Sequence, residues 1–423
     1  MKSKIYERIG EQVYSETLEN GLQVFVIKKP DFSKSLAFFA TKYGGADRRF
    51  RLGGQWTDTP AGVAHFLEHK MFDMEYGDAL TKFSQNGASA NAFTSGDMTA
   101  YHFECTDCFY ENLDILLEFV STPYFSKESV DKEQGIIGQE IRMTEDSPDF
   151  VLYYNLLKAL YKDNPVRDSV AGTIESISEI TAETLYNCHS VFYSPSNMVL
   201  CAVGNIDPEK VVKAAEKILP KNFSIAPERD YGNKETMLPV KKEEISVMEV
   251  GLPMFIVGSK VIPAKRGDAL LKQGIVADLA LEYLFGNSSP FYSKYYAEGL
   301  INAEFSAEFE NVASAAYTMI GGESKEPQKA KEAIINEINK VCENGIDEAL
   351  FKRLKKAEIG AALRALNSFD NLCYNMAKGC FEGYDAMLTV EITNAVTSDD
   401  ILEFIKTNLK PEYFAMSVIH SAE

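Results

Sequence analysis

The chain of 423 residues has few basic residues for its content of acidic ones: 43 lysines and arginines stand against 62 aspartates and glutamates, a formal net charge of −19. A surface with this balance repels a phosphate backbone, so we expect no nucleic-acid partner. Hydrophobic residues nevertheless make up 45% of the sequence and aromatic residues 11%. That composition excludes a disordered or fibrous protein and leaves enough apolar material for two or three folded domains.

Long apolar runs are also absent. No stretch reaches the roughly 18 consecutive apolar residues that a membrane-spanning helix needs. The N-terminal segment is interrupted by glutamates and contains no apolar core of the kind found in secretory signal peptides. We therefore expect a cytoplasmic protein with no membrane span.

The seven cysteines are odd in number and scattered along the chain, which argues against a disulfide scaffold. Cys105 and Cys108 form one C-x-x-C pair, but no second pair accompanies it. Neither a zinc knuckle nor a redox site is therefore indicated. We interpret both residues as reduced cysteines at the end of a strand.

Local patterns predict a mixture of strands and helices. Short runs of β-branched and aromatic residues bounded by turn residues predict strands, and apolar residues spaced by three and four predict helices. The predicted strands cover residues 22–27 and 35–41, with two more between 88 and 104. The predicted helices cover residues 62–72, 79–85, 109–121 and 127–144.

One helix-to-strand pattern occurs twice. Thr181 begins a capped helical segment, and Pro195 follows 14 residues later at the start of a strand-like run. Thr397 and Pro411 repeat this arrangement with the same spacing, 216 residues further along the chain. The offset is about half the chain length, which indicates an internal duplication.

A similar offset relates one helical segment near the start of each half. Glu68 in the first half corresponds to Glu282 in the second, but the histidines that flank Glu68 are replaced by Leu279 and Tyr283. We infer a duplicated unit of about two hundred residues in which only the first copy carries polar chemistry.

We therefore predict an α+β fold made of two duplicated α/β units. Each unit is expected to be a mostly antiparallel sheet packed with helices, and the two are expected to face each other across a linker. The predicted division is an N-terminal unit over 1–221, a polar linker with Pro and Gly over 222–244, and a C-terminal pseudo-duplicate over 245–423.

Two of the five histidines stand in one short motif with Glu68. His65 and His69 are four residues apart, about 400° on an α-helix, so they share a face and can bind one metal ion. Glu68 projects onto the same face. The motif is H-x-x-E-H, in which two imidazoles bind zinc and the carboxylate handles the proton of the bound water. The other three histidines lack such partners and are expected to be structural or solvated: His102, His189 and His420.

A catalytic zinc site needs a third protein ligand and one open position. The predicted helix over 127–144 contains Glu133 and Glu140, seven residues apart and so nearly on one face. One of them can coordinate the metal, while the other can orient a histidine or the ligand itself.

Three segments together resemble the pitrilysin/insulinase family of zinc metallopeptidases, the inverzincins, in its short, processing-peptidase-like bacterial branch. They are the H-x-x-E-H motif, the strand around residues 87–95 and the helix from Glu133 to Glu140, and the likeness extends over essentially the whole chain. The resemblance implies a zinc-dependent endopeptidase that binds one Zn²⁺ per chain and hydrolyses unfolded peptides in an extended conformation.

The resemblance also implies a role for each site residue. It makes His65, His69 and Glu140 the zinc ligands, Glu68 the general base and Glu133 a supporting carboxylate. A further segment is similar to the family's edge strand, which pairs with an extended peptide. This predicted substrate-binding segment consists of Ala90, Asn91, Ala92, Phe93 and Thr94.

One part of the family pattern is missing. The second half normally contributes an Arg and a Tyr around a Gly-Leu pair, and here Tyr296 and Asn302 stand at those positions. Loss of one oxyanion donor typically costs on the order of 3 kcal/mol. Two-subunit members of the family that the sequence resembles take the Arg and Tyr from a related subunit, so the resemblance implies a dimer, homo- or heteromeric, with a related subunit that supplies this pair. In the heterodimer, that subunit lacks zinc.

Two alternatives remain open. The missing Arg and Tyr favour a catalytically inactive peptidase-fold protein with an interaction or assembly role, although the complete set of metal-binding residues disfavours it. A self-sufficient homodimer would instead use Tyr292, Tyr295 or Tyr296 in place of the missing pair. The charge of −19 would favour basic peptides if acidic residues line the substrate chamber, whereas a solvated acidic surface would only aid solubility.

Overall fold

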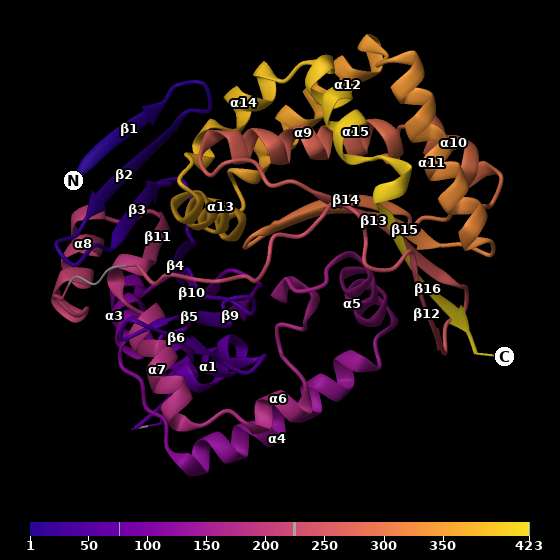
Figure 1. The fold of residues 1–423 in the computed structure, drawn as a ribbon. Coiled ribbons are helices and arrows are strands. Elements are labelled where there is room, and N and C mark those ends of the chain that lie inside the picture. The colour runs from indigo at the N-terminus through magenta and orange to yellow at the C-terminus, as the bar shows by residue number, and fades with distance from the viewer. Residues whose placement is uncertain (76, 223–225, 423) are drawn as a thin grey trace. The chain divides into compact units, whose positions relative to one another are not determined.

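Two mixed sheets form the framework of the protein, and each belongs to its own compact unit (Figure 1). The computed structural model describes residues 1–75, 77–222 and 226–422. Unit 1 consists of Met1–Ile141, Ser169–Tyr231 and Leu363–Met387. Unit 2 consists of Arg142–Asp168, Gly232–Ala362 and Leu388–Glu423.

The sheet of unit 1 has the strand order β1-β2-β3-β11-β4-β10-β9 among the described residues. Neighbouring strands are antiparallel except β3 and β11, which are parallel. The central strands β4 and β11 are buried along their whole length, as their continuous apolar sequences require. The strands are β1 (Lys2–Tyr6), β2 (Glu11–Thr17), β3 (Gln23–Lys28), β4 (Ser35–Thr41), β9 (Ser89–Thr94), β10 (Thr99–Cys105) and β11 (Met198–Gly204). Two short hairpins accompany them: β5 (Arg49–Leu52) with β6 (Gln55–Asp58), and β7 (Asp73–Met74) with β8 (Gly77–Asp78).

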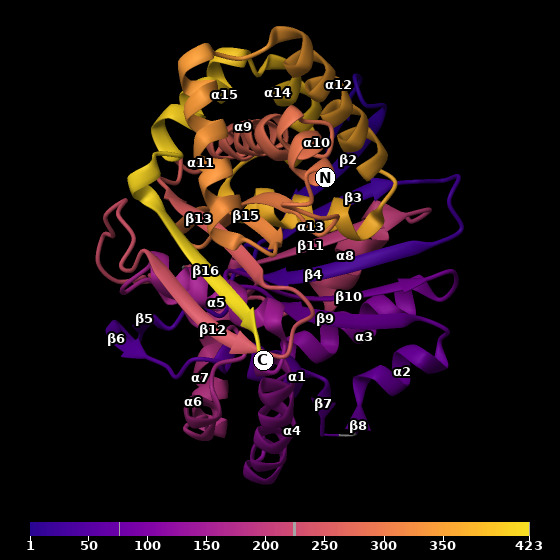
Figure 2. The same ribbon diagram turned by 90° about the vertical axis from the view of Figure 1, so that its right-hand side faces the viewer.

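Helices cover both faces of this sheet. The helix α13 contacts β4 and β11, while α1 and α3 contact β10 (Figure 2). The helix α4 begins in unit 1, and its last residues, from Arg142 onward, belong to unit 2. The helices are α1 (Val63–Met71), α2 (Ala79–Gln85), α3 (Phe109–Ser121), α4 (Lys127–Glu145), α6 (Ile174–Ser178), α7 (Ala182–Phe192), α8 (Pro208–Ile218) and α13 (Phe369–Glu382).

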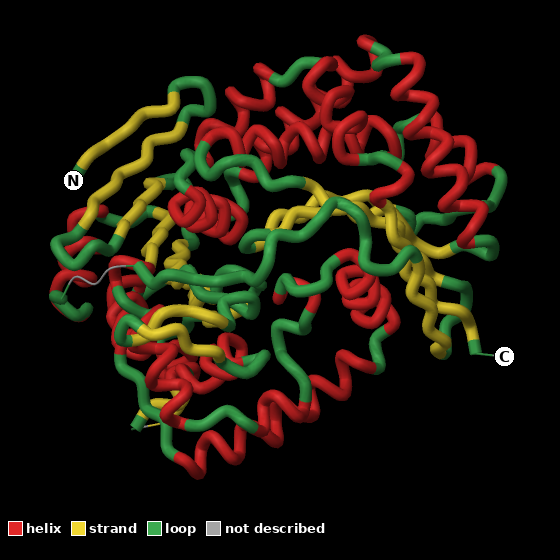
Figure 3. The backbone as a smooth tube through the Cα atoms, viewed as in Figure 1, coloured by secondary structure: helices red, strands yellow, loops and turns green. Residues whose placement is uncertain are grey.

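The sheet of unit 2 has the strand order β12-β16-β13-β15-β14. Its strands are β12 (Glu243–Met248), β13 (Met254–Val261), β14 (Ser306–Val312), β15 (Ala315–Glu323) and β16 (Phe414–Ser421). Its helices are α5 (Pro148–Leu160), α9 (Asp268–Phe285), α10 (Pro290–Ala297), α11 (Pro327–Asn344), α12 (Glu348–Ala365), α14 (Thr389–Ala395) and α15 (Ser398–Asn408). The helix α5 lies on one face of the sheet, and α9, α11 and α15 lie on the other (Figure 3).

The two sheets share one topology, which confirms the duplicated α+β fold. The order β3-β11-β4-β10-β9 in unit 1 corresponds to β12-β16-β13-β15-β14 in unit 2. In each series the first pair of strands is parallel and the remaining pairs are antiparallel. The repeated helix and strand are also present, because Thr181 caps α7 before β11 and Thr397 caps α15 before β16.

The compact units are not continuous in the chain, because two helices pack with the sheet of the other sequence half. The helix α5 lies within the predicted segment 1–221 but packs on β13 and β16. The helix α13 lies within 245–423 but packs on β4 and β11. The packing crosses the boundaries predicted from the sequence at these two helices. Domain boundaries that divide the sequence into continuous segments cannot assign these two helices to the units with which they pack.

The predicted linker over 222–244 is held by one charged residue on each side. Its residues 223–225 lie outside the described part of the chain. In unit 1, Arg229 Nε lies 2.9 Å from Oδ1 of the buried Asp47. In unit 2, Glu235 Oε1 accepts backbone N–H groups of residues 162–164, and its Oε2 lies 3.0 Å from Lys260 Nζ. The strand β12 begins inside the predicted linker, at Glu243.

The local predictions for the first half are confirmed. The strands β3, β4, β9 and β10 and the helices α1, α2, α3 and α4 all lie where the sequence patterns placed them, with ends shifted by a residue or two. Among the described residues, no helix combines the length and the apolar character needed to cross a membrane.

Candidate metal centre

The helix α1 separates an apolar face from a polar one. Its Val63, Phe66 and Leu67 are buried in the core of unit 1. The chain enters α1 at Gly62, whose φ of 96° lies in the left-handed region that favours glycine. A Cβ atom at Gly62 would lie 2.6 Å from the carbonyl oxygen of Ala171, so the tight entry requires this residue. The buried face fixes the rotation of the helix, and the imidazoles of the motif then project toward α4.

The two imidazoles of the motif meet one carboxylate of α4. His65 Nε2 lies 3.4 Å from Glu140 Oε1, and His69 Nε2 lies 3.6 Å from Glu140 Oε2. Two ligand atoms on a tetrahedral zinc ion, with bonds of about 2.0–2.1 Å, lie about 3.3 Å apart. Donor atoms of all three residues lie within 4.8 Å of one another, and no other group of His, Cys, Asp or Glu in the described ranges has this spacing. These three residues therefore have the geometry and the chemistry to hold one zinc ion.

Each histidine is constrained on its other nitrogen. Nδ1 of His69 lies 3.2 Å from Glu133 Oε1, so a proton on Nδ1 would be donated to this carboxylate and would leave Nε2 free to bind. Nδ1 of His65 is buried and has no hydrogen-bond partner in the described part of the chain. Glu133 thus lies where its predicted supporting role requires, and Nε2 is the available nitrogen of both rings.

A buried lysine completes the surroundings of Glu133. The side chain of Lys70 has no exposed surface, and its Nζ lies 3.7 Å from Glu133 Oε2. Lys70 also donates to Asp73. A buried charge is tolerated only when it is paired, so the three residues form one ionic group that holds Glu133 against His69.

Glu68 lies beside the metal-binding residues and is nearly fully buried. Its Oε2 accepts a hydrogen bond of 2.8 Å from the hydroxyl of Thr94, the last residue of β9. Burial raises the pKa of Glu68 above its usual value, although the Thr94 hydrogen bond and the two imidazoles oppose the shift. A carboxyl with a raised pKa can both accept and return a proton near neutral pH.

The electrostatics of the other site residues follow from the same contacts. Burial lowers the pKa of His69, but the hydrogen bond to Glu133 and the surrounding carboxylates outweigh it and leave this pKa raised. The hydrogen bond with His65 lowers the pKa of Glu140. Without a metal, the cluster therefore favours a positively charged His69 imidazole beside a negatively charged Glu140 carboxylate. The same negative charge would attract a metal cation.

The predicted substrate-binding segment forms most of β9. This strand pairs only with β10 and stands last in the strand order, so within the described residues it is an edge strand, as predicted. Asn91 is exposed, and Ala90, Ala92, Phe93 and Thr94 are half-buried. An edge strand presents unpaired backbone groups that can form hydrogen bonds with another extended chain.

The structure places Tyr296 and Asn302 in unit 2. Tyr296 is half exposed and stacks on Tyr292, with ring centroids 5.5 Å apart. Asn302 Nδ2 donates to Glu323 Oε2 at 2.7 Å, and its Oδ1 accepts the backbone N–H of Glu304. Asn302 is thus engaged in local contacts.

The remaining histidines and the cysteine pair agree with their predicted structural roles. His189 is buried with Nε2 3.1 Å from the carbonyl oxygen of Val120, and burial lowers its pKa to about 4. His102 Nδ1 lies 3.5 Å from Oδ1 of Asp370 in α13, and His420 is exposed. Cys105 and Cys108 are free cysteines at and just after the end of β10.

Comparison with known proteins places the chain in a family. A sequence profile described as Insulinase (Peptidase family M16) matches residues 53–174, and a profile described as Peptidase M16 inactive domain matches residues 179–358. The zinc protease YmfH of Bacillus subtilis, described as uncharacterized, is 40% identical over 409 residues, 96% of this chain and 95% of that protein. The chain belongs to the insulinase family, peptidase family M16. The resemblance recognised from the sequence is thereby confirmed.

Solved structures of M16 proteins share the fold over the whole chain. An M16-like peptidase from Alicyclobacillus acidocaldarius has a TM-score of 0.93 at 33% identity, over 97% of this chain and 99% of that one. Pitrilysin has a TM-score of 0.77 at 18% identity, over 98% of this chain and 45% of pitrilysin. The second similarity concerns the fold alone.

Two contacts near the site were not predicted from the sequence, although Thr94 itself belongs to the predicted substrate-binding segment. The hydroxyl of Thr94 contacts Glu68, but a threonine in a predicted strand carries no signal of such a partner. Lys70 carried a signal that could have been used. It lies four residues after Phe66 and three after Leu67, on the buried face of α1, where a charged residue needs a partner.

Proposed function

We propose that this M16 protein is a zinc-dependent endopeptidase that hydrolyses unfolded peptides, with one zinc ion per chain. The observation that carries the proposal is the convergence of His65 Nε2, His69 Nε2 and the Glu140 carboxylate, with Glu68 alongside. The set of two His and one Glu with an open position is typical of catalytic zinc sites. The names of zinc protease relatives support the same chemistry.

In this proposal each residue has a defined task. His65, His69 and Glu140 would hold the ion, and Glu133 would keep the ring of His69 in position. When bound, a zinc ion would supply Lewis-acid chemistry, lowering the pKa of a water molecule toward neutrality and polarising the substrate carbonyl. Glu68 takes the proton of the attacking water and later gives it to the leaving amine. The Thr94 hydroxyl holds the Glu68 carboxylate in place.

The substrate is proposed to be an extended peptide that pairs with β9. Backbone hydrogen bonds along an edge strand would supply affinity for any sequence, and side-chain contacts would supply selectivity. Ala90, Asn91, Ala92 and Phe93 are the residues of β9 that would flank such a peptide before Thr94.

The test of the chemistry is Glu68→Gln in the full chain. This variant should retain one zinc ion per chain, measured by plasma mass spectrometry, and should lose peptide hydrolysis. Glu111→Gln on α3 removes one carboxylate away from the site and should change neither quantity. Hydrolysis by Glu68→Gln at the rate of the parent chain would overturn the assignment of the base.

We further propose that the chain is the metal-bearing subunit of a heterodimer whose second, related subunit lacks zinc and supplies an Arg and a Tyr. The observation in favour is that Tyr296 and Asn302 occupy the positions of that pair in this chain. Purification from the native host followed by cleavage assays with and without the recovered partner tests this. Equal activity of the isolated chain and the mixture would contradict the heterodimer.

Equal activity of that kind would leave a homodimer that uses the tyrosines of α10. The stacked pair Tyr292 and Tyr296 is compatible with that role, although it equally serves local packing.

A cytoplasmic location is part of the proposal as well, because the free cysteines, buried and exposed, suit a reducing compartment. Fractionation of host cells with an antibody to the chain would test the location.

The second candidate function is a catalytically inactive interaction or assembly protein. The residues at positions 296 and 302 favour it, as does the match of residues 179–358 to an inactive domain profile. Metal content separates the two functions. Fewer than about 0.1 zinc ions per chain after purification without chelator would favour the assembly role.

A further inference from the structure

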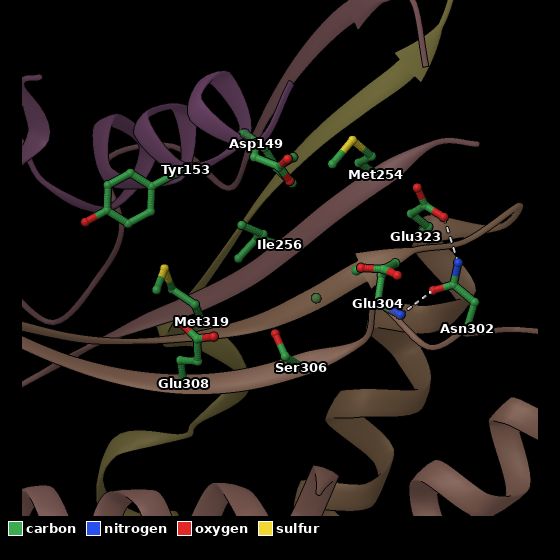
Figure 4. Close-up of a pocket in the computed structure, with 13 residues that line it drawn as sticks. Asp149, Tyr153, Met254, Ile256, Asn302, Glu304, Ser306, Glu308, Met319 and Glu323 are labelled. Atoms are coloured by element: carbon green, nitrogen blue, oxygen red, sulfur yellow. Dashed lines mark hydrogen bonds between the residues drawn. The ribbon is translucent and has the colours of Figure 1, made fainter. Parts of the chain in front are cut away.

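A hollow of about 490 Å³ lies in unit 2, on the face of the sheet that carries α5. The residues Asp149, Leu152 and Tyr153 of α5 form one wall, and β13, β15 and β14 form the floor and the opposite wall (Figure 4). Its volume is in the range of pockets that bind small molecules or side chains. We call it the unit 2 hollow.

The hollow exists because one row of the sheet carries small side chains. Ile256 of β13, Gly321 of β15 and Ser306 of β14 are paired across the three strands. A side chain at Gly321 is excluded, because a Cβ atom there would lie 2.0 Å from the carbonyl oxygen of Phe255. Paired residues point to the same face, so the glycine and the serine leave space above the sheet beside Ile256.

The floor and the rim of the hollow differ in chemistry. Met254, Ile256 and Met319 supply an apolar floor. Among the described residues that line the hollow there is no lysine, arginine or histidine, and the rim carries four carboxylates: Asp149, Glu304, Glu308 and Glu323 (Figure 4). Three of them form none of the ion pairs found among the described residues, and Glu323 receives only the amide of Asn302.

The spacing of the four carboxylates determines which kind of cation the unit 2 hollow can bind. Within the described ranges, no three of these carboxylates have oxygens close enough to bind one metal ion together, since the one group of three residues with that spacing is in unit 1. A larger cation with an apolar stem fits better. The methylene groups of a lysine or arginine can lie on apolar surface while the charged end remains among polar groups.

The adjoining strand indicates how such a side chain would arrive. β14 stands last in the strand order of unit 2 and, in the described part of the chain, pairs only with β15. Along β14, Ser306 and Glu308 are exposed and line the hollow, while Ala307 and Phe309 pack against the core of unit 2. A peptide in extended conformation beside β14 would place alternate side chains on the side of the hollow.

We propose that the unit 2 hollow binds a lysine or arginine side chain of an extended peptide, so that the protein selects basic peptides. The ligand class, a peptide, rests on the proposed function, whereas the site and the preference for positive charge rest on the hollow itself. Glu308 and Glu304 attract the charged end, and Met254, Ile256 and Met319 receive the stem.

The experiment measures binding to the full-length, zinc-loaded Glu68→Gln chain, so that cleavage does not interfere. A short fluorescein-labelled peptide with one lysine and no other charge is compared by anisotropy with the same peptide carrying norleucine. The lysine peptide should bind roughly fivefold to tenfold more tightly at low salt, and the difference should shrink as salt screens the carboxylates.

Variants locate the preference. Adding Glu304→Gln and Glu308→Gln should abolish the difference between the two peptides without changing the affinity for the norleucine peptide. The matched control adds Glu332→Gln and Glu343→Gln, two exposed carboxylates of α11 that leave the same net charge. This control should keep the preference for lysine.

The possible failures are distinguishable. If the Glu68→Gln chain binds both peptides equally, or if the α11 control loses the preference as well, the hollow is not the site of charge recognition, and the proposed peptidase function still stands. If zinc-loaded protein binds neither peptide at any concentration, the proposed peptidase function itself is contradicted. Thermal unfolding at the parent temperature would show that the variants are folded.

Discussion

The same topological helix has opposite chemistry in the two units. In unit 1, α1 packs against the edge strand β9 and presents His65 and His69 to α4. In unit 2, α9 packs against the edge strand β14, and the corresponding residues, Leu279 and Tyr283, are buried. The Tyr283 hydroxyl accepts the backbone N–H of Asp347 at the start of α12. The duplicated fold therefore supplies the position, and two side chains decide whether it can hold a metal.

The glutamate of this helix is present in both units but has different neighbours. Burial raises the pKa of Glu68 and of Glu282 alike. Glu68 has two imidazoles and the Thr94 hydroxyl nearby, whereas the neighbour that further raises the pKa of Glu282 is the carboxylate of Glu358. Glu68 also has a carboxylate nearby, but that carboxylate belongs to Glu140 of the metal-binding group, whereas Glu358 belongs to no group with such spacing among the described residues. The comparison indicates that the chemistry depends on the histidines and on α4, and not on the carboxyl group alone.

The strongest test of this comparison replaces the two histidines of α1 with the residues that stand at the corresponding positions of α9. The double variant His65→Leu and His69→Tyr removes two of the three proposed zinc ligands, so zinc should fall from one ion per chain to below about 0.1. Peptide hydrolysis should fall to background with it. Plasma mass spectrometry and a peptide cleavage assay measure the two effects.

The matched control for this variant is His420→Tyr, which replaces an exposed histidine at the end of β16. It should keep both zinc and activity. Circular dichroism identifies a double variant that has merely unfolded. A folded double variant that still holds one zinc ion per chain would show that the metal lies elsewhere.

The next comparison concerns the two residues that anchor the predicted linker over 222–244, Arg229 in unit 1 and Glu235 in unit 2. Asp47 is almost completely buried, and burial raises its pKa although Arg229 lies beside it. Arg229→Met would leave that carboxylate without its cation, and breaking a buried pair in this way costs about 3–5 kcal/mol. Hydrogen exchange should show the loss of protection in the strands of unit 1 and little change in those of unit 2.

The double variant Asp47→Asn with Arg229→Met serves as the control for this pair. Removing both charges avoids the uncompensated carboxylate, so part of the protection in unit 1 should return. If the single variant leaves hydrogen exchange in unit 1 unchanged, Arg229 does not anchor the segment.

These anchors show where prediction from the sequence ends. The strands and helices of the first half could be predicted, because their apolar periodicity and turn residues are local signals. The internal duplication could be inferred from the repeated Thr and Pro spacing and from the paired positions of Glu68 and Glu282, whereas the strand order required the structure. The packing of α5 and α13 with the sheet of the other half could not, since no local pattern records which sheet a helix covers.

The candidate site divides in the same way. Helical spacing could bring His65 and His69 together, and it left Glu133 and Glu140 as candidates for the third ligand; the family resemblance selected Glu140. The ionic group of Lys70, Asp73 and Glu133 depends on a contact between α1 and α4, and the unit 2 hollow depends on the alignment of three strands. Contacts between distant segments of this kind require the structure.

Lys70 allows a finer test of why α1 and not α9 can hold a metal. Lys70→Met keeps the size of the side chain but removes the charge that pairs with Glu133 and Asp73. Glu133 would then hold His69 less firmly, and the loss of such support typically lowers metal affinity about 10–100-fold. Competition with a fluorescent zinc chelator measures the change, and Lys213→Met, an exposed site on α8, should have no effect. Unchanged zinc affinity in Lys70→Met would limit the lysine to a structural role.

The smallest expected effect concerns Glu235, the anchor in unit 2. Burial alone would raise its pKa, but backbone N–H groups and Lys260 outweigh burial and leave it lowered. The stabilisation is therefore present above the unfolded value of about 4.3 and is lost as the pH falls through the lower folded pKa. Glu235→Gln keeps an acceptor oxygen but loses the charge, at a cost of about 1–2 kcal/mol at neutral pH. Hydrogen exchange in unit 2 should thus depend less on pH between 5 and 3 in this variant than in the parent chain or in the exposed control Glu249→Gln. Equal pH dependence in all three proteins would show that Glu235 does not anchor the linker in unit 2 as Arg229 does in unit 1.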